Sequence, residues 1–96
     1  MEKAVILHHN DNVATLLSKV QKGETIKVKI NDEIVEIEIL QDIPFGHKIS
    51  IKNIKKNEKV IKHGEVIGLA SKDILKGFHV HIHNIQSYRS NYLSKK

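Results

Sequence analysis

The sequence predicts a single, mainly β domain with one short helix, and three observations lead to this fold class. The chain has 96 residues, enough for one core in a two-layer architecture but not for two cores. Ile and Val supply 23 residues, against two Phe and two Tyr, and β-branched side chains pack well on a sheet. Apolar and charged residues alternate over residues 26–39, which is the period of a strand with one buried face.

The N-terminal segment is expected to form a strand followed by the helix. Residues Lys3 to Leu7 are mostly apolar and predict the strand. Asn10 and Asp11 offer side-chain oxygens for an N-cap, and Gly23 suits the left-handed position after a helix. Apolar residues then recur at helical spacing, at Val13, Leu16, Leu17 and Val20. These signals predict a helix over residues 12–21.

The next segment has the pattern of a β-hairpin. Lysines alternate with apolar residues over 26–30, and glutamates alternate with apolar residues over 35–39. Asn31 and Asp32 lie between the two runs, and both residue types favour tight turns. Lysines on one strand and glutamates on the other can therefore face each other across the pair.

The second half predicts shorter strands joined by many turns. The expected strands are 47–51, 60–62, 65–69 and 79–85. An internal echo also appears, because residues 53–60 match residues 73–80 in the placement of Asn or Asp, Ile and a basic residue, and residues 22–26 form a fainter copy. A compact domain that reuses one turn-then-strand module explains this pattern better than a solenoid does. We expect this domain to span residues 1–86 and a polar tail to span 87–96.

Composition excludes several functional classes. The chain has no cysteine, so disulfides and thiolate metal sites are ruled out. Its apolar runs are too short for a signal peptide or a membrane span, which favours a cytoplasmic protein without membrane contact. The formal net charge is +5, but the lysines are interleaved with acidic residues and aromatics are scarce. A nucleic-acid binder is therefore the weakest interpretation.

Three alternating histidines are the clearest candidate for chemistry. On a strand His79, His81 and His83 would share one face, while Val80 and Ile82 would point into the core. Neighbouring histidines would have Cα atoms about 6.6 Å apart, close enough for two imidazoles to bind one metal ion. His79 and His83 would be separated by roughly 13 Å, so three ligands on one ion would need a bend. A pair of these histidines with a ligand from elsewhere is the simpler geometry.

An ordered series of motifs resembles one known family. The series runs Ile-Pro-Phe-Gly-His-Lys at 43–48, Val-Ile-Lys-His-Gly-Glu-Val-Ile-Gly at 60–68, Asp-Ile at 73–74 and His-Val-His-Ile-His-Asn at 79–84. It is similar to the N-terminal domain of altronate and galactarate dehydratases and to the small subunit of sulfolactate sulfo-lyase. The Asp-Asn-Val-Ala segment at 11–14 fits the same pattern. The resemblance covers roughly residues 5–85.

This resemblance implies a SAF-type β-clip fold and a role in a metal-dependent lyase. It implies a divalent metal, with iron(II) expected, shared with a separate large dehydratase subunit that carries most of the active site. The chain alone is therefore expected to be inactive. The substrate would be a sugar acid. Assembly of the chain into a homo-oligomer is also possible.

Individual site residues follow from the motifs. His47, Lys48 and Lys62 are the predicted catalytic residues, and Lys48, Lys62 and Asn84 are the predicted contacts to the substrate. Loss of an α-proton turns a carboxylate into a more highly charged enediolate, which cations stabilise. The predicted metal ligands are His79, His81 and His83, with His47 as the additional candidate.

Two alternatives remain beside the sugar-acid hydro-lyase subunit. The chain could serve as the small subunit of a sulfolactate sulfo-lyase, in which sulfite and not water leaves. It could also be a non-catalytic SAF-type module that binds a sugar acid or a partner protein. Activity that appears only in a complex with a large subunit would distinguish an enzyme subunit from a binding module.

Overall fold

The computed structural model describes residues 3–87, and every regular element in that range is a β-strand. Of the predicted tail 87–96, residues 88–96 lie outside the described residues. The strands are β1 (Ala4–Val5), β2 (Val13–Leu16), β3 (Thr25–Ile30), β4 (Glu33–Glu38), β5 (Lys48–Ser50), β6 (Lys59–Lys62), β7 (Glu65–Ala70), β8 (His79–Val80) and β9 (Ile85–Gln86). The predicted mainly β fold is therefore confirmed. No helix capable of crossing a membrane occurs in the described part of the chain.

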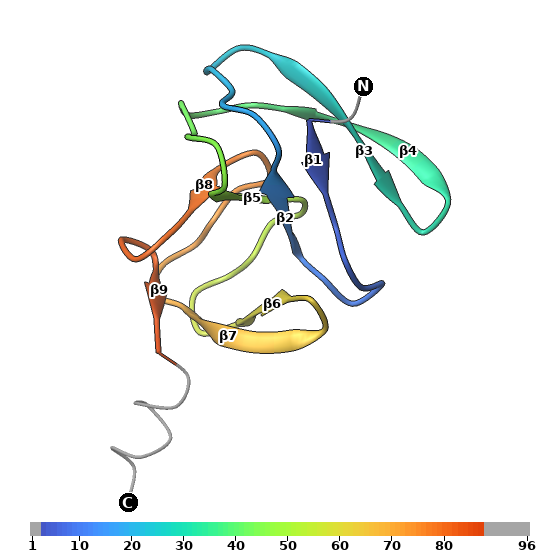
Figure 1. Cartoon of the computed structure of the whole chain (residues 1–96). Helices are drawn as coiled ribbons and strands as arrows, with labels where there is room; N and C mark the ends of the chain where they lie inside the picture. Colours follow the sequence, from blue (N-terminus) through green and yellow to red (C-terminus); the bar gives the residue numbers. More distant parts are fainter. Residues whose placement is uncertain (1–2, 88–96) are drawn as a thin grey trace, which may run out of the picture.

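The strands form three antiparallel sheets. A four-stranded sheet has the order β1-β2-β5-β8, β3 pairs with β4, and a three-stranded sheet has the order β6-β7-β9. The two long hairpins, β3–β4 and β6–β7, lie at opposite ends of the molecule with the four-stranded sheet between them (Figure 1).

The hairpin predicted from the alternating lysines and glutamates is confirmed. Strands β3 and β4 pair over their whole length, and Lys27 lies opposite Glu36. Asn31 and Asp32 both have positive φ, 50° and 69°, as a two-residue turn between twisted strands requires. The inward-facing side chains of Val28 and Ile37 are fully buried.

The predicted helix at 12–21 is wrong. Residues Val13–Leu16 form β2, which pairs with β1 on one side and β5 on the other. Val20 forms an isolated bridge with Ile43. Sheet pairing on both sides supplies the backbone hydrogen bonds that a helix would have supplied locally, so tertiary context overrides the helical spacing.

The two expected N-cap residues bind distant backbone instead. The buried Asp11 carboxylate accepts hydrogen bonds from the backbone N–H groups of Leu7, His8 and Gly64 at 2.8–3.0 Å. Burial alone would raise the pKa of the Asp11 carboxyl, but these N–H groups, led by that of Gly64, outweigh burial and lower it. The Asn12 side chain donates to the Lys59 carbonyl and accepts from the Ile61 N–H. The two side chains therefore join the N-terminal segment to the β6–β7 hairpin.

The internal sequence repeat at residues 53–60 and 73–80 corresponds to a repeated structural module. Each copy consists of a bridge residue, a tight turn and a strand, and the copies pair through the bridges Val20–Ile43 and Ile54–Ile74. The turn residue has positive φ in every copy, at Gly23, Gly46, Asn57 and Gly77. Side-chain carboxylates or amides then accept from the turn of the paired copy, as Asp42 does from the Lys22 N–H. The copy around Ile43 was not recognised in the sequence, because its Pro44 and Phe45 disguise the pattern.

Two apolar cores lie on the two faces of the four-stranded sheet. Successive residues of β2 belong to different cores, since Ala14 packs with the β3–β4 side and Val13 packs with the β6–β7 side. This is the expected result of side-chain alternation on a strand. Val80 of β8 is fully buried in the second core, the one on the β6–β7 side.

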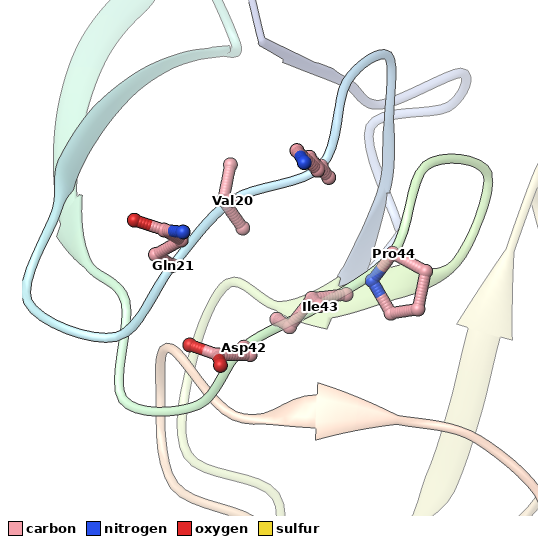
Figure 2. A pocket seen from close by; sticks show the side chains of 6 residues that line it. Val20, Gln21, Asp42, Ile43 and Pro44 are labelled. Atoms are coloured by element: carbon pink, nitrogen blue, oxygen red, sulfur yellow. The ribbon is translucent and has the colours of Figure 1, made fainter.

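A shallow pocket of about 290 Å³ lies along the Val20–Ile43 bridge. Figure 2 shows its two segments side by side, with Gln21 and Asp42 at one end and Pro44 at the other. The Asp42 carboxylate already accepts from the Lys22 N–H. The lining holds no histidine and no group of metal ligands, so it offers little chemistry.

The predicted strand 79–85 is interrupted. Strand β8 ends at Val80, the chain turns at residues 81–84, and β9 begins at Ile85. Val80 is buried as predicted, but the prediction that Ile82 faces the core is wrong, because its side chain is 84 % exposed at the tip of the turn.

Aspartate substitutions on the two sides of this break should therefore have opposite effects on stability. Val80→Asp places an unpaired charge in the second core and should lower the free energy of unfolding by about 3–5 kcal/mol. Ile82→Asp should change it by less than about 0.5 kcal/mol, since the side chain is solvated. Urea denaturation of the two variants measures both values. Equal losses would mean that Ile82 is buried.

Candidate functional site

The turn after β8 gathers the histidines, and Asn84 holds this turn. The Asn84 side chain is buried, donates to the His79 carbonyl at 2.8 Å and accepts from the His81 N–H at 2.9 Å. Its own backbone N–H donates to the His81 carbonyl at 3.0 Å. Because the chain reverses here, the rings of His79 and His83 have centroids 5.1 Å apart. The prediction of an extended spacing between them is wrong.

His47, His79 and His81 form one cluster. Each offers a ring nitrogen that lies within 4.8 Å of the others, and all three side chains are partly buried. His47 Nδ1 and His79 Nε2 are 2.9 Å apart, and the rings of His47 and His81 stack at 4.3 Å. In the described residues this is the only group of three potential metal ligands that meets these limits.

Three different parts of the fold bring these histidines together. His47 follows Gly46, whose φ of 83° turns the chain into β5. His79 lies on β8, paired with Ile49 of β5. His81 lies in the turn that Asn84 holds. The cluster therefore joins segments that are more than 30 residues apart in the sequence.

The surroundings favour neutral imidazoles. The pKa of His79 is lowered from 6.5 to about 4, first by burial and then by the positive charges of His83 and His47. Burial and the charges of His47 and Lys48 also lower the pKa of His81. Neutral imidazoles have a lone pair available for a metal ion or a proton.

Two lysines make this region cationic. Burial, followed by the positive charge of Lys62, lowers the pKa of the Lys48 ammonium group. Lys48 in turn acts on both His79 and His81. Every charge that shifts the pKa of Lys48, His79 or His81 is positive. The cluster is therefore suited to an anionic ligand.

A groove of about 260 Å³ adjoins the cluster. Lys48 and His81 line one part of it, Gln86 and Ser87 add polar groups, and Ile67, Ile82 and Ile85 supply apolar surface. The region thus combines a cationic edge with an apolar surface.

The structure brings together most, but not all, of the predicted site residues. His47, Lys48, Lys62, His79 and His81 act on one another through contacts or charges. His83 is exposed and contacts only the His79 ring among the described histidines, so it lies beside the ligand group. The amide of Asn84 is directed at backbone groups, and its predicted contact to substrate stays a prediction.

Gln41 supports the cluster, although no pattern in the sequence identifies it. Its Oε1 accepts from the His79 N–H at 3.0 Å, so it fixes the backbone of a cluster residue from a distant loop. A glutamine that follows a hairpin carries no pattern that would identify this role. His8 and His9 stack on each other at 4.3 Å, and no described contact links them to the cluster.

Comparison with known proteins identifies the family. The family model described as "Altronate/galactarate dehydratase SAF domain" matches residues 2–88. The chain belongs to this family. The resemblance seen in the motifs is thereby confirmed, and the β-rich fold described above is that of a SAF domain.

Relatives occur both as parts of long chains and as a short subunit. The altronate dehydratase of Bacillus subtilis is 40 % identical over 91 residues, which cover 95 % of this chain and 18 % of that protein. The galactarate dehydratase of Escherichia coli is 34 % identical over 74 % of this chain and 13 % of its own length. The (2R)-sulfolactate sulfo-lyase subunit alpha of Chromohalobacter salexigens is 31 % identical over 88 % of this chain and 94 % of its own. The chain thus spans less than a fifth of the matched dehydratases.

The lowered pKa of His79 can be measured directly. In chelator-treated protein the His79 ring signals should titrate with a midpoint near 4, because burial disfavours the charged ring. Since the unfolded chain binds this proton more tightly, the contribution of His79 to stability is full above pH 6.5 and declines as pH falls toward 4. An NMR titration of the ring protons tests the pKa. A midpoint close to 6.5 would show that the ring is solvated.

Proposed function

We propose that this chain is the SAF domain of a lyase that removes water from a sugar acid and acts with a larger catalytic chain. The observation that carries the proposal is the cationic cluster formed by Lys48, Lys62 and the partly buried imidazoles of His47, His79 and His81. The long relatives are an altronate dehydratase and a galactarate dehydratase, which supports a sugar acid as the substrate class.

The cationic cluster suits the charge that develops in such a reaction. A base removes the proton on the carbon next to the carboxylate, the electron pair forms an enediolate, and the β-hydroxyl leaves as water after protonation. Lys48 and Lys62 would hold the carboxylate and stabilise the added negative charge. A neutral imidazole of the cluster would accept or return a proton.

We also propose that a divalent metal ion, with iron(II) the expected one, is shared between this domain and the larger chain. The nitrogen donors present fit such an ion, because imidazole binds first-row transition metals well. When bound, the ion would act as a Lewis acid on the substrate oxygens. Catalytic groups missing from this small domain would come from the larger chain.

The groove beside the cluster supports the partnership. Ile82 is 84 % exposed at its rim, and Ile67 and Ile85 extend the apolar surface. Covering such a surface with the larger chain would remove apolar area from water and exclude solvent from the cluster.

A sulfo-lyase subunit is the second candidate function. One observation favours it, namely that the sulfolactate sulfo-lyase subunit alpha is matched over 94 % of its length, whereas the dehydratases are matched over less than a fifth. The same cluster would serve, because the α-proton abstraction is unchanged and sulfite is the leaving group.

The isolated chain should show no measurable dehydration of altronate or galactarate, because one small domain lacks a complete set of catalytic groups. When it replaces the matching 91-residue segment in the Bacillus subtilis altronate dehydratase, the chimera should retain turnover. The assay follows formation of the keto acid product.

Two controls make this experiment decisive. The dehydratase without that segment should be inactive, and a chimera carrying both Lys48→Met and Lys62→Met should have a turnover or substrate affinity lower by roughly tenfold or more, since two carboxylate contacts are lost. Turnover by the isolated chain, or full activity of the doubly substituted chimera, would contradict the proposal.

A further inference from the structure

We propose that this chain by itself binds a divalent transition-metal ion through His47, His79 and His81, and that Asn84 is the positioning residue of this site. The inference deepens the proposed function by naming the ligands that the domain contributes. It differs from the ligand set predicted from sequence, because His47 takes the place of His83.

The ring nitrogens have the separations that one ion needs. Metal–nitrogen bonds of about 2.1 Å place ligand nitrogens roughly 3.0–3.4 Å apart in octahedral or tetrahedral geometry. His47 Nδ1 and His79 Nε2 are hydrogen-bonded at 2.9 Å, and a nitrogen of His81 lies within 4.8 Å of both. A small inward movement of His81 therefore completes the set. One of the two hydrogen-bonded nitrogens carries the shared proton, which a metal ion would displace.

The orientation of the rings must change as well. The planes of His47 and His81 are 19° apart, and those of His79 and His81 are 15° apart. Imidazole lone pairs lie in the ring plane, so parallel rings cannot all point at one ion. Binding requires rotation about side-chain bonds while the backbone stays in place.

The backbone beneath the three rings is held firmly. Gln41 accepts from the His79 N–H, and Asn84 donates to the His79 carbonyl. Asn84 also binds both the N–H and the carbonyl of His81. The His47 carbonyl accepts a hydrogen bond of 2.8 Å from the Leu16 N–H. Such outer contacts fix ligand geometry and raise metal affinity.

The donor set selects the class of ion. Three imidazole nitrogens suit zinc, cobalt, iron or nickel, whereas magnesium and calcium prefer oxygen ligands. Three protein ligands also leave coordination positions open for a water molecule, a substrate oxygen or a side chain of the larger chain. Lys48 acts electrostatically on His79 and His81, so an anionic ligand would be favoured in the open position.

The test is a cobalt(II) titration of the full 96-residue chain, followed by calorimetry and by visible absorption. The chain should bind one Co²⁺. His47→Ala and His81→Ala should each weaken binding by roughly tenfold or more, since a ligand is lost. The matched control His83→Ala removes an exposed imidazole from the same turn and should change the affinity by less than about twofold, because His83 contacts only the edge of the cluster at His79 and offers no nitrogen to the three-ligand group.

Asn84→Ala should weaken Co²⁺ binding and alter the absorption band, because both polar atoms of the Asn84 side chain hold the backbone of His79 and His81 and that support is lost while all three ligands remain. Gln41→Ala is the milder second variant, because Gln41 is only partly buried and holds His79 alone. Its affinity should fall by a smaller factor than that of His47→Ala.

The proposal is overturned if the chain binds no Co²⁺, if His47→Ala and His81→Ala bind as the unsubstituted chain does, or if His83→Ala is as damaging as His47→Ala. These measurements use no enzyme activity. Failure here with an active chimera would reject the metal site alone, whereas metal binding with an inactive chimera would reject the lyase function alone.

Discussion

The buried amide of Asn84 is the interaction on which the candidate site depends. It replaces strand pairing with side-chain bonds to the backbone of His79 and His81, so the chain can reverse without leaving those groups unpaired. Without the reversal, alternate histidines would be spread along an extended strand. With it, two of them face a third that arrives from the turn before β5. One buried side chain thus converts a regular sequence pattern into a compact cluster.

Much of the fold could be predicted from local sequence. The β3–β4 hairpin follows from the alternation of Lys27 and Glu36 with apolar residues, because burial of one face fixes the register. The helix could not be excluded locally, since Val13 and Leu16 have helical spacing and only β1 and β5 decide their conformation. The role of Asp11 was misassigned for the same reason, as its hydrogen-bond partner Gly64 is 53 residues away.

Most residues of the candidate site could be predicted from the sequence, but their arrangement in space could not. His47 was named as an additional ligand because a strand holds only two imidazoles near one ion. The break after Val80 was not foreseen, because Asn84 in a polar motif resembles a substrate contact as much as a turn residue. Gln41 gave no signal at all. The repeated turn module explains the remaining framework, since the copy containing Gly46 delivers His47 and the copy containing Gly77 delivers His79.

The turn at residues 81–84, held by Asn84, lets His79 and His81 meet His47 in the proposed metal site. Anomalous diffraction at the cobalt edge, from crystals of the chain grown with Co²⁺, tests it most directly. One strong peak is expected within about 2.1 Å of a nitrogen of each of these three rings, with the backbone of residues 79–84 unchanged. A peak at His83 or at the His8–His9 pair, with none between the three rings, would contradict it.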